Sequence, residues 1–116
     1  MLINTNKYDI SMVRGDTLSF GIELEGLDQD LDYARFIAGK EYGSHDIVID
    51  VILGDGIWKQ DATHYGVRIP PEDTAALEGM AYYYDLEIGA NGDVFTILHG
   101  RLIVDDDLRT EGSNNA

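Results

Sequence analysis

Three aspartates near the middle of the chain are spaced as in the opening of a calcium-binding loop. Asp28, Asp30 and Asp32 stand at the first, third and fifth positions of the loop in which carboxylate oxygens bind Ca²⁺. The pattern then departs, because Tyr33 occupies the sixth position, which needs glycine, and Gly39 the twelfth, which needs a bidentate glutamate. We therefore expect a solvated acidic loop, with a weak calcium site as the alternative.

A second acidic run, Asp105, Asp106 and Asp107, stands at the end of an expected strand. Its oxygens are also suited to a hard cation, and again we expect a solvated loop. Paired carboxylates suffice for glycoside hydrolysis, but no single pair stands out among the 22 acidic residues. The sequence therefore assigns no catalytic residue, metal or cofactor, and we expect the protein not to be an enzyme.

The three histidines are the candidates for acid–base chemistry near neutral pH. On a strand, His45 and its neighbour Asp46 would point to opposite faces. His99 shares strand parity with Phe95 and Ile97, which predicts that it lines the core or its edge. Because no nucleophile motif accompanies His45, His64 or His99, we expect solvated or packed structural histidines.

One tryptophan and seven tyrosines are the residues suited to stacking on sugar rings. Tyr82 and Tyr84 share one strand face with Leu86, so core packing accounts for them. Tyr82 also follows a turn, which predicts a tyrosine corner, in which the hydroxyl bonds back to the preceding backbone. Trp58 and Tyr65 remain as candidate contacts to a ligand or a partner.

The tripeptide Arg14-Gly15-Asp16 is one that some cell-surface receptors recognise. Its place between two expected strands favours a strand-to-strand turn.

Composition limits the classes of partner. The chain of 116 residues carries 8 Lys and Arg against 22 Asp and Glu, a net charge of −14, which disfavours contact with nucleic acid. It has no cysteine, which excludes disulfides and thiolate zinc sites. No apolar run approaches the length of about 20 residues needed to span a membrane, and no secretory signal is evident at the N-terminus.

Alternating apolar residues predict seven strands, at 10–13, 17–24, 33–38, 46–53, 64–69, 82–88 and 94–104. A short helical turn is expected near residues 71–78, where Pro71 opens it and Gly79 closes it. Asn91-Gly92 predicts a tight hairpin between the last two strands. These elements indicate an all-β, immunoglobulin-like antiparallel sandwich, with a small barrel as the competitor. We expect a single domain at 10–109, an N-terminal extension at 1–9 and a flexible polar tail at 110–116.

Four segments, taken in order, resemble a family of small immunoglobulin-like domains in tail and baseplate proteins of bacteriophages and prophages. They are Arg14-Gly15-Asp16-Thr17 before a strand, Pro71-Glu72-Asp73-Thr74 with Leu77, Tyr82-x-Tyr84-Asp85-Leu86, and Asp93 to Gly100 leading into Leu102-x-Val104. The chain resembles the N-terminal portion of upper-baseplate proteins, and the resemblance spans roughly residues 10 to 110. It implies turns and strands, so it carries over no catalytic residue.

The resemblance implies a non-enzymatic structural protein of the virion, a small tail or baseplate accessory domain that binds other tail or baseplate proteins. We expect it in the host cytoplasm during synthesis and in the virion after assembly, with self-association left open. Neither nucleic acid nor a membrane is expected as a partner. The alternative is a carbohydrate- or cell-surface-binding sandwich module that uses Trp58.

Overall fold

The structure is a computed structural model that describes residues 5–43 and 46–108. These residues form nine strands and one short helix. In chain order the elements are β1 (Asn6–Lys7), β2 (Ile10–Val13), β3 (Leu18–Glu23), β4 (Tyr33–Gly39), β5 (Ile47–Leu53), β6 (Gly56–Lys59), β7 (His64–Ile69), α1 (Pro71–Ala75), β8 (Ala81–Ala90) and β9 (Asp93–Asp105).

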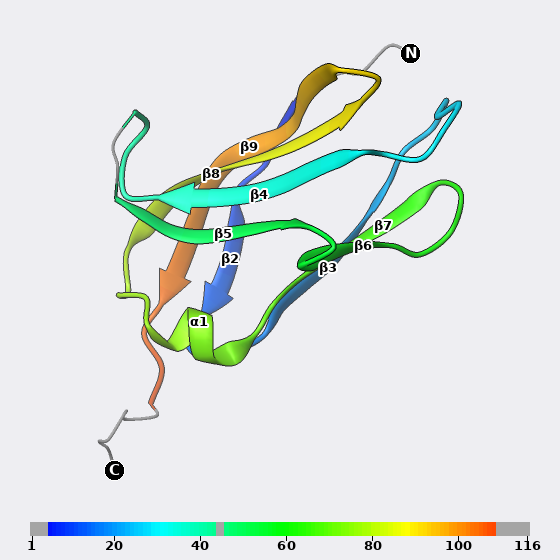
Figure 1. Cartoon of the computed structure of the whole chain (residues 1–116). Helices are drawn as coiled ribbons and strands as arrows, with labels where there is room; N and C mark the ends of the chain where they lie inside the picture. The colour runs from blue at the N-terminus through cyan, green and yellow to red at the C-terminus, as the bar shows by residue number, and fades with distance from the viewer. Residues whose placement is uncertain (1–4, 44–45, 109–116) are drawn as a thin grey trace.

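The strands belong to one mixed sheet with the order β1-β9-β8-β4-β5-β6-β7-β3, and β2 pairs with β9 beyond β1. The sheet curls, so that β9, β8, β4 and β5 lie on one side and β6, β7 and β3 on the other (Figure 1). The chain changes sides at the short Gly54-Asp55 connection between β5 and β6. This curl encloses the core between the two halves of the sheet.

The core is built from alternate residues of the central strands. On β8, Tyr82, Tyr84, Leu86 and Ile88 are all buried, as their shared parity predicts. Tyr84 stacks on Phe36 of β4 with ring centroids 5.2 Å apart. Phe36 in turn meets Phe20 of β3 edge-on at 5.8 Å, across the two halves of the sheet. Aromatic contacts of this kind add to the hydrophobic effect that holds the two halves together.

The all-β prediction is confirmed, and all seven predicted strands are present. The strand list was incomplete, because β1 and β6 are additional and the sheet is not purely antiparallel. Both β1 and β2 run parallel to β9, and β5 and β6 also pair in parallel. β6 is flanked by the Gly54-Asp55 connection and has only four residues, so its sequence lacks the alternation by which the longer strands were recognised.

The predicted hairpin is confirmed: Ala90 pairs with Asp93, and Asn91 and Gly92 both have positive φ angles, of 55° and 82°.

A bulge in β9 overturns the prediction that His99 lines the core or its edge. Leu86 is opposite Leu98 and Glu87 is opposite Thr96, so Ile97 is an extra residue. The extra residue shifts the parity of the strand, and His99 lies opposite Asp85 on the outer face of the sheet rather than along the core.

The remaining turns also follow the sequence. The helix ends at Ala75, within the predicted 71–78 segment. Arg14, Gly15 and Asp16 form the turn between β2 and β3, and the Asp16 carbonyl accepts a hydrogen bond from the Thr74 hydroxyl. The described part of the expected N-terminal extension lies along β9, where the Tyr8 N–H donates to the His99 carbonyl. His45 and the expected tail at 110–116 lie outside the described residues.

The helix of the described region is far too short and polar to cross a bilayer.

Candidate interaction surface

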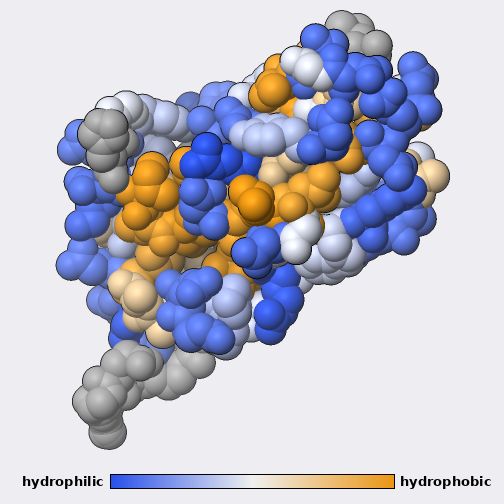
Figure 2. All heavy atoms as spheres, viewed as in Figure 1, coloured by the Kyte–Doolittle hydropathy of each residue, from blue (hydrophilic) through white to orange (hydrophobic). Residues whose placement is uncertain are grey.

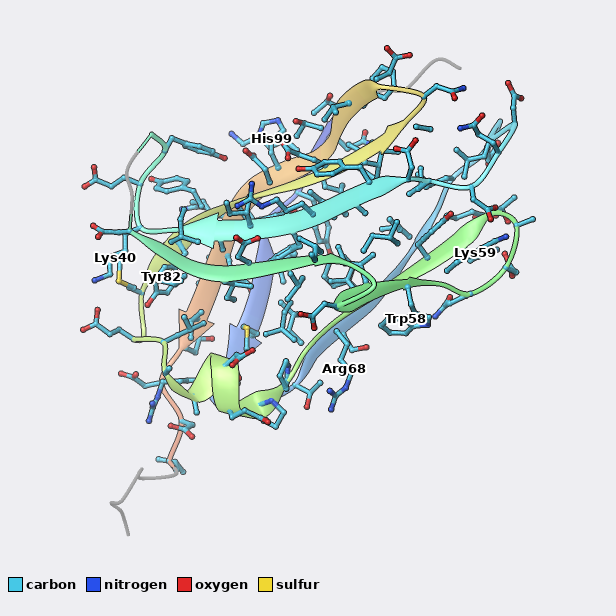
Figure 3. The ribbon with its side chains drawn as sticks, viewed as in Figure 1. Lys40, Trp58, Lys59, Arg68, Tyr82 and His99 are labelled. Atoms are coloured by element: carbon cyan, nitrogen blue, oxygen red, sulfur yellow. The ribbon has the colours of Figure 1, made fainter. Side chains whose placement is uncertain are left out.

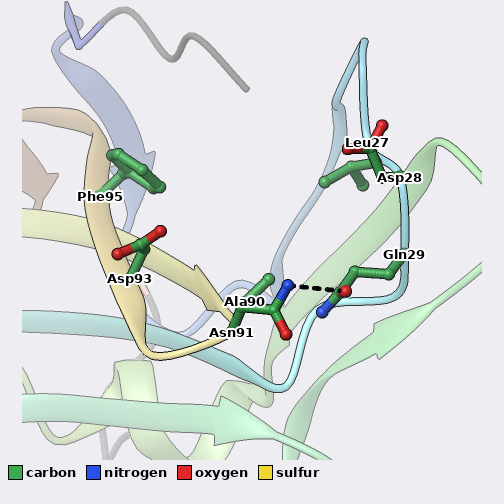
Figure 4. A pocket seen from close by; sticks show the side chains of 7 residues that line it. All are labelled: Leu27, Asp28, Gln29, Ala90, Asn91, Asp93 and Phe95. Carbon is green, nitrogen blue, oxygen red and sulfur yellow. Dashed lines mark hydrogen bonds between the residues drawn. The ribbon is translucent and has the colours of Figure 1, made fainter.

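The first aspartate run does not converge on one point. The Asp30 carboxylate lies 2.8 Å from Lys59 Nζ, and Asp32 accepts the backbone N–H of Asn91 at 3.1 Å. Asp28 lines a pocket of about 140 Å³ between its own loop and the β8–β9 hairpin, shown in Figure 4. Across that pocket, Asn91 Nδ2 donates to Gln29 Oε1 at 2.9 Å. The run therefore ties its loop to β6 and to the hairpin.

The second aspartate run is likewise divided. Asp107 forms an ion pair with Arg14 at 3.3 Å, and the Asp105 carbonyl accepts the Arg14 N–H. Asp106 is exposed and lies against Gly79. Across residues 5–43 and 46–108, no group of three or more His, Asp or Glu side chains is arranged to hold a metal ion.

The two described histidines have separate surroundings. His64 Nδ1 lies 2.8 Å from Asp61 and its Nε2 lies 3.7 Å from Glu23. The hydrogen bond to Asp61 raises the pKa of His64, with smaller contributions from the charges of Asp61 and Glu23. Opposite His99, partial burial raises the pKa of Asp85, and the charge of Glu87 adds to that effect. His64 on β7 and His99 on β9 therefore make separate surface contacts, on different halves of the sheet.

The two aromatic candidates separate in the structure. Tyr65 is 1% exposed, and its hydroxyl accepts the buried N–H of Leu31 at 2.9 Å, so its ring belongs to the core. Trp58 is 41% exposed and points away from the core (Figure 3). Its ring covers Gly66, the residue directly across from it on β7. Of the pair, Trp58 alone is available to a ligand.

Strand β5 forms a surface feature that its sequence does not reveal. Six of its seven residues are apolar, yet Ile49 is the one fully buried side chain among them. Ile47 is 45% exposed and Ile52 is 49% exposed. Figure 2 shows an apolar band across the middle of the face that carries β5, with hydrophilic side chains beneath it. An apolar strand this exposed is uncommon unless it meets a partner.

One edge of β5 has no strand beside it over most of its length. β4 pairs along the other edge from Ile47 to Ile52, whereas β6 pairs only with Ile52 and Leu53. The N–H and C=O of Ile52 both bond to Asp55, on the side away from β4. Because backbone direction alternates along an antiparallel strand, the N–H and C=O of Asp50 point the same way, to the unpaired side. We call Ile47–Val51 the free edge of β5.

The Asp50 side chain is held on the outer face. Its carboxylate receives two hydrogen bonds of 2.8 Å from the Arg35 guanidinium on β4. These bonds lower the pKa of Asp50. The polar side chain of β5 is therefore neutralised by its own neighbour, which keeps an uncompensated charge away from the free edge.

An open groove of about 480 Å³ adjoins the start of the free edge. Its apolar wall consists of Val48 from β5, Leu77 from the segment after α1, and the ring of Tyr82 from β8. Lys40 and Glu78 also line it and lie 3.7 Å apart as an exposed ion pair. Figure 1 shows α1 and the segment that follows it on the opposite side of this opening from β5. The free edge thus combines unpaired backbone groups with an apolar groove.

A second groove, of about 350 Å³, lies on the outer face of β8 and β9, and two of its charged side chains pair with each other. Arg101 forms an ion pair with Asp9 at 2.9 Å, and Tyr42 and Tyr83 contact each other with ring centroids 4.9 Å apart. The free edge of β5 is the better candidate because it alone of these surfaces offers unpaired backbone in the described structure.

Compared with known proteins, the chain matches no family model, and no curated protein matches it.

Proposed function

We propose that this chain is a non-enzymatic assembly domain that binds other proteins, of the kind that builds bacteriophage or prophage tails and baseplates. The observation that carries the proposal is the free edge of β5, where exposed apolar side chains accompany unpaired backbone groups. A sheet edge of this kind is a template for pairing with another chain, which natural monomers usually block. Its partners would be other tail or baseplate proteins, and its location the assembled virion.

The immunoglobulin-like assignment belongs to the same proposal. It is supported by the two halves of the sheet that pack face to face, and by the Tyr82 hydroxyl, which bonds to the backbone of Glu78. The four segments that resemble the phage family also fall at structurally defined places: a turn, the helix α1, and the paired strands β8 and β9. The parallel pairing of β1 and β2 with β9 is compatible with a sandwich in which the first strand joins the second sheet.

Sequencing the reading frames on either side of this gene, and co-expressing each product with the chain, tests the proposal. We expect tail, tape-measure or baseplate genes, and at least one product that co-purifies as a stoichiometric complex. Since the chain carries a net charge of −14, we also expect that complex to weaken as salt rises. Neighbouring genes for glycan processing, with no stable complex from any of them, would contradict the assembly role.

A carbohydrate-binding module is the second candidate, and one observation favours it. Trp58 lies over Gly66, with the Gln60 side chain beside it, and presents part of its ring on the outer face of β6. An exposed indole face suits stacking on a sugar ring. Quenching of Trp58 fluorescence by host cell-wall polysaccharide, lost in Trp58→Ala, would support this function, and a flat titration would exclude it.

A further inference from the structure

We propose that the free edge of β5 takes up, as an added strand, an extended segment of a partner protein in which apolar and basic side chains alternate. This inference rests on the proposed assembly function and names the chemistry of the partner. It assigns the contact to Ile47–Val51 and the adjoining groove, rather than to the outer faces of the sheet.

The backbone of Asp50 supplies the reason for an extended strand. Its N–H and C=O point away from β4, and within the described residues no strand meets them. A strand laid along this edge would satisfy both groups and extend the sheet by one member. A helix or a globular surface would leave them bonded to water, so an extended segment uses this edge best.

The groove beside the edge supplies the reason for apolar side chains at alternate positions. Side chains of an added strand project to opposite faces in turn, and every second one would face the core side of the sheet. On that side lie Val48, which is half-buried, and Leu77 and Tyr82, which line the groove and are themselves buried against the core. Burial of apolar side chains here would stabilise the complex by the usual hydrophobic contribution.

The charge around the edge supplies the reason for basic residues between the apolar ones. Glu78 lines the groove, Glu72 and Asp73 are exposed in the first turn of α1, and Asp55 follows the strand. Lys40 offsets one of these carboxylates. A lysine or arginine on the added strand would meet this acidic border, whereas an equally acidic second copy of the chain would be repelled by it.

Among the described residues, the sheet also ends at β3, which pairs only with β7, and at β1 and β2, which pair only with β9. β3 is less suited to this contact than β5. Its outward residues are Ser19, Gly21 and Glu23, and its apolar side chains, Leu18 and Ile22, are already buried in the core. Polar residues and glycine along an edge discourage pairing. β1 has two residues and β2 has four, so both offer a shorter edge than the seven residues of β5.

The test uses the full chain and a blocked nine-residue peptide of alternating valine and lysine, with a valine–glutamate peptide of the same length as its control. Backbone NMR shifts locate the contact, and a titration gives the dissociation constant. We expect the valine–lysine peptide to perturb residues 47–53 and the valine–glutamate peptide to leave them unchanged. Ile47→Lys should weaken binding by about tenfold or more, because it places a basic side chain at the edge.

Two pairs of variants control for folding and for charge. Val94→Lys makes the same exchange at another exposed apolar strand position and should leave the dissociation constant within about twofold. Glu78→Lys should weaken binding, while Glu25→Lys, which changes the net charge equally on an exposed loop away from the groove, should weaken it less. Thermal unfolding shows that each variant folds.

The inference is overturned if the peptide perturbs β3 or the Trp58 face instead, or if folded Ile47→Lys binds it as well as Val94→Lys does. It is also overturned if sedimentation shows a dimer of the chain that Ile47→Lys dissolves, because the occupant is then a second copy. A protein partner whose affinity is indifferent to Ile47→Lys would leave the assembly function standing and reject this site. Peptide binding at β5 with no partner among the neighbouring gene products would reject the function and retain the site.

Discussion

Tyr82 and Glu78 close the turn that leads into β8. The Tyr82 hydroxyl accepts the Glu78 N–H at 2.8 Å and donates to the Glu78 carbonyl at 3.2 Å, while the ring is buried against the core. The same ring forms part of the wall of the groove beside β5. One side chain therefore connects the turn before β8 with the surface proposed to receive a partner.

Replacing Tyr82 by phenylalanine should destabilise the protein by about 1–2 kcal/mol, because the backbone groups of Glu78 lose their partner while the ring volume is kept. Urea unfolding measures the loss. Tyr83→Phe is the matched control, since Tyr83 is the next residue on the same strand but is exposed, and it should change the free energy of unfolding very little. Equal losses in the two variants would show that the turn does not depend on the Tyr82 hydroxyl.

Gly100 on β9 lies against the backbone of the N-terminal segment at Tyr8. A Cβ atom at this position would collide with the carbonyl oxygen of Tyr8, which also accepts a hydrogen bond from the Tyr84 hydroxyl at 2.6 Å. We expect Gly100→Ala to cost about 1–3 kcal/mol in the free energy of unfolding.

The control for Gly100→Ala is Gly21→Ala, because a Cβ atom on Gly21 meets its nearest neighbour at an ordinary 3.7 Å. In chemical denaturation this variant should be neutral or slightly stabilising. If Gly100→Ala proved as stable as Gly21→Ala, the packing of the Tyr8 backbone against β9 would be wrong.

The Arg35–Asp50 pair should make stability depend on pH in the acidic range. Hydrogen bonds from Arg35 hold the pKa of Asp50 below its unfolded value of about 3.9, so the pair stabilises the fold above that value. The stabilisation disappears as the pH falls through the lower, folded pKa. Because both side chains are more than a third exposed, we expect less than about 1 kcal/mol at pH 7.

The direction of this pH dependence is tested by measuring the free energy of unfolding of wild type and Asp50→Asn from pH 7 to pH 2, a range of about 5 pH units. The difference between the two proteins should be largest at the neutral end and vanish at the acid end. A difference that grew toward low pH would mean that Asp50 is not stabilised as a carboxylate.

His64 should titrate above its ordinary pKa of about 6.5, since its ring bonds to the Asp61 carboxylate. NMR titration of the ring protons gives the midpoint directly. Asp61→Asn should lower that midpoint, and Glu23→Gln should lower it less, because Glu23 acts only through its charge at 3.7 Å. An unchanged midpoint in Asp61→Asn would contradict the assigned contact.

The sequence predicts most of the local structure, because local rules decide it. Asn91-Gly92 specifies the hairpin through the positive φ angles that this turn requires. The alternation from Tyr82 to Ile88 specifies which face of β8 is buried. The bulge at Ile97 could not be read in the same way, because Ile97 and Leu98 are both apolar and either one fits the core.

The free edge of β5 could not be predicted from local sequence patterns, because it depends on which strands lie beside β5. Six apolar residues in β5 are typical of a strand buried on both faces, and the sequence alone does not show that one edge lacks a neighbour. Tyr65 is the converse case: the sequence leaves it open as a candidate contact, and its pairing opposite Ile22 in the structure places it in the core. Pairing between distant segments determines both outcomes.

The most direct test of the free edge is the amide hydrogen exchange of Asp50 compared with that of Val51, its neighbour on β5. The alternating backbone directs the Val51 N–H to β4 and the Asp50 N–H to the unpaired side. In the isolated protein we predict that Asp50 exchanges much faster than Val51, and that the valine–lysine peptide slows Asp50 by about tenfold or more. Equal protection of both amides before the peptide is added, or an Asp50 rate that the bound peptide leaves unchanged, would contradict a strand-accepting edge at β5.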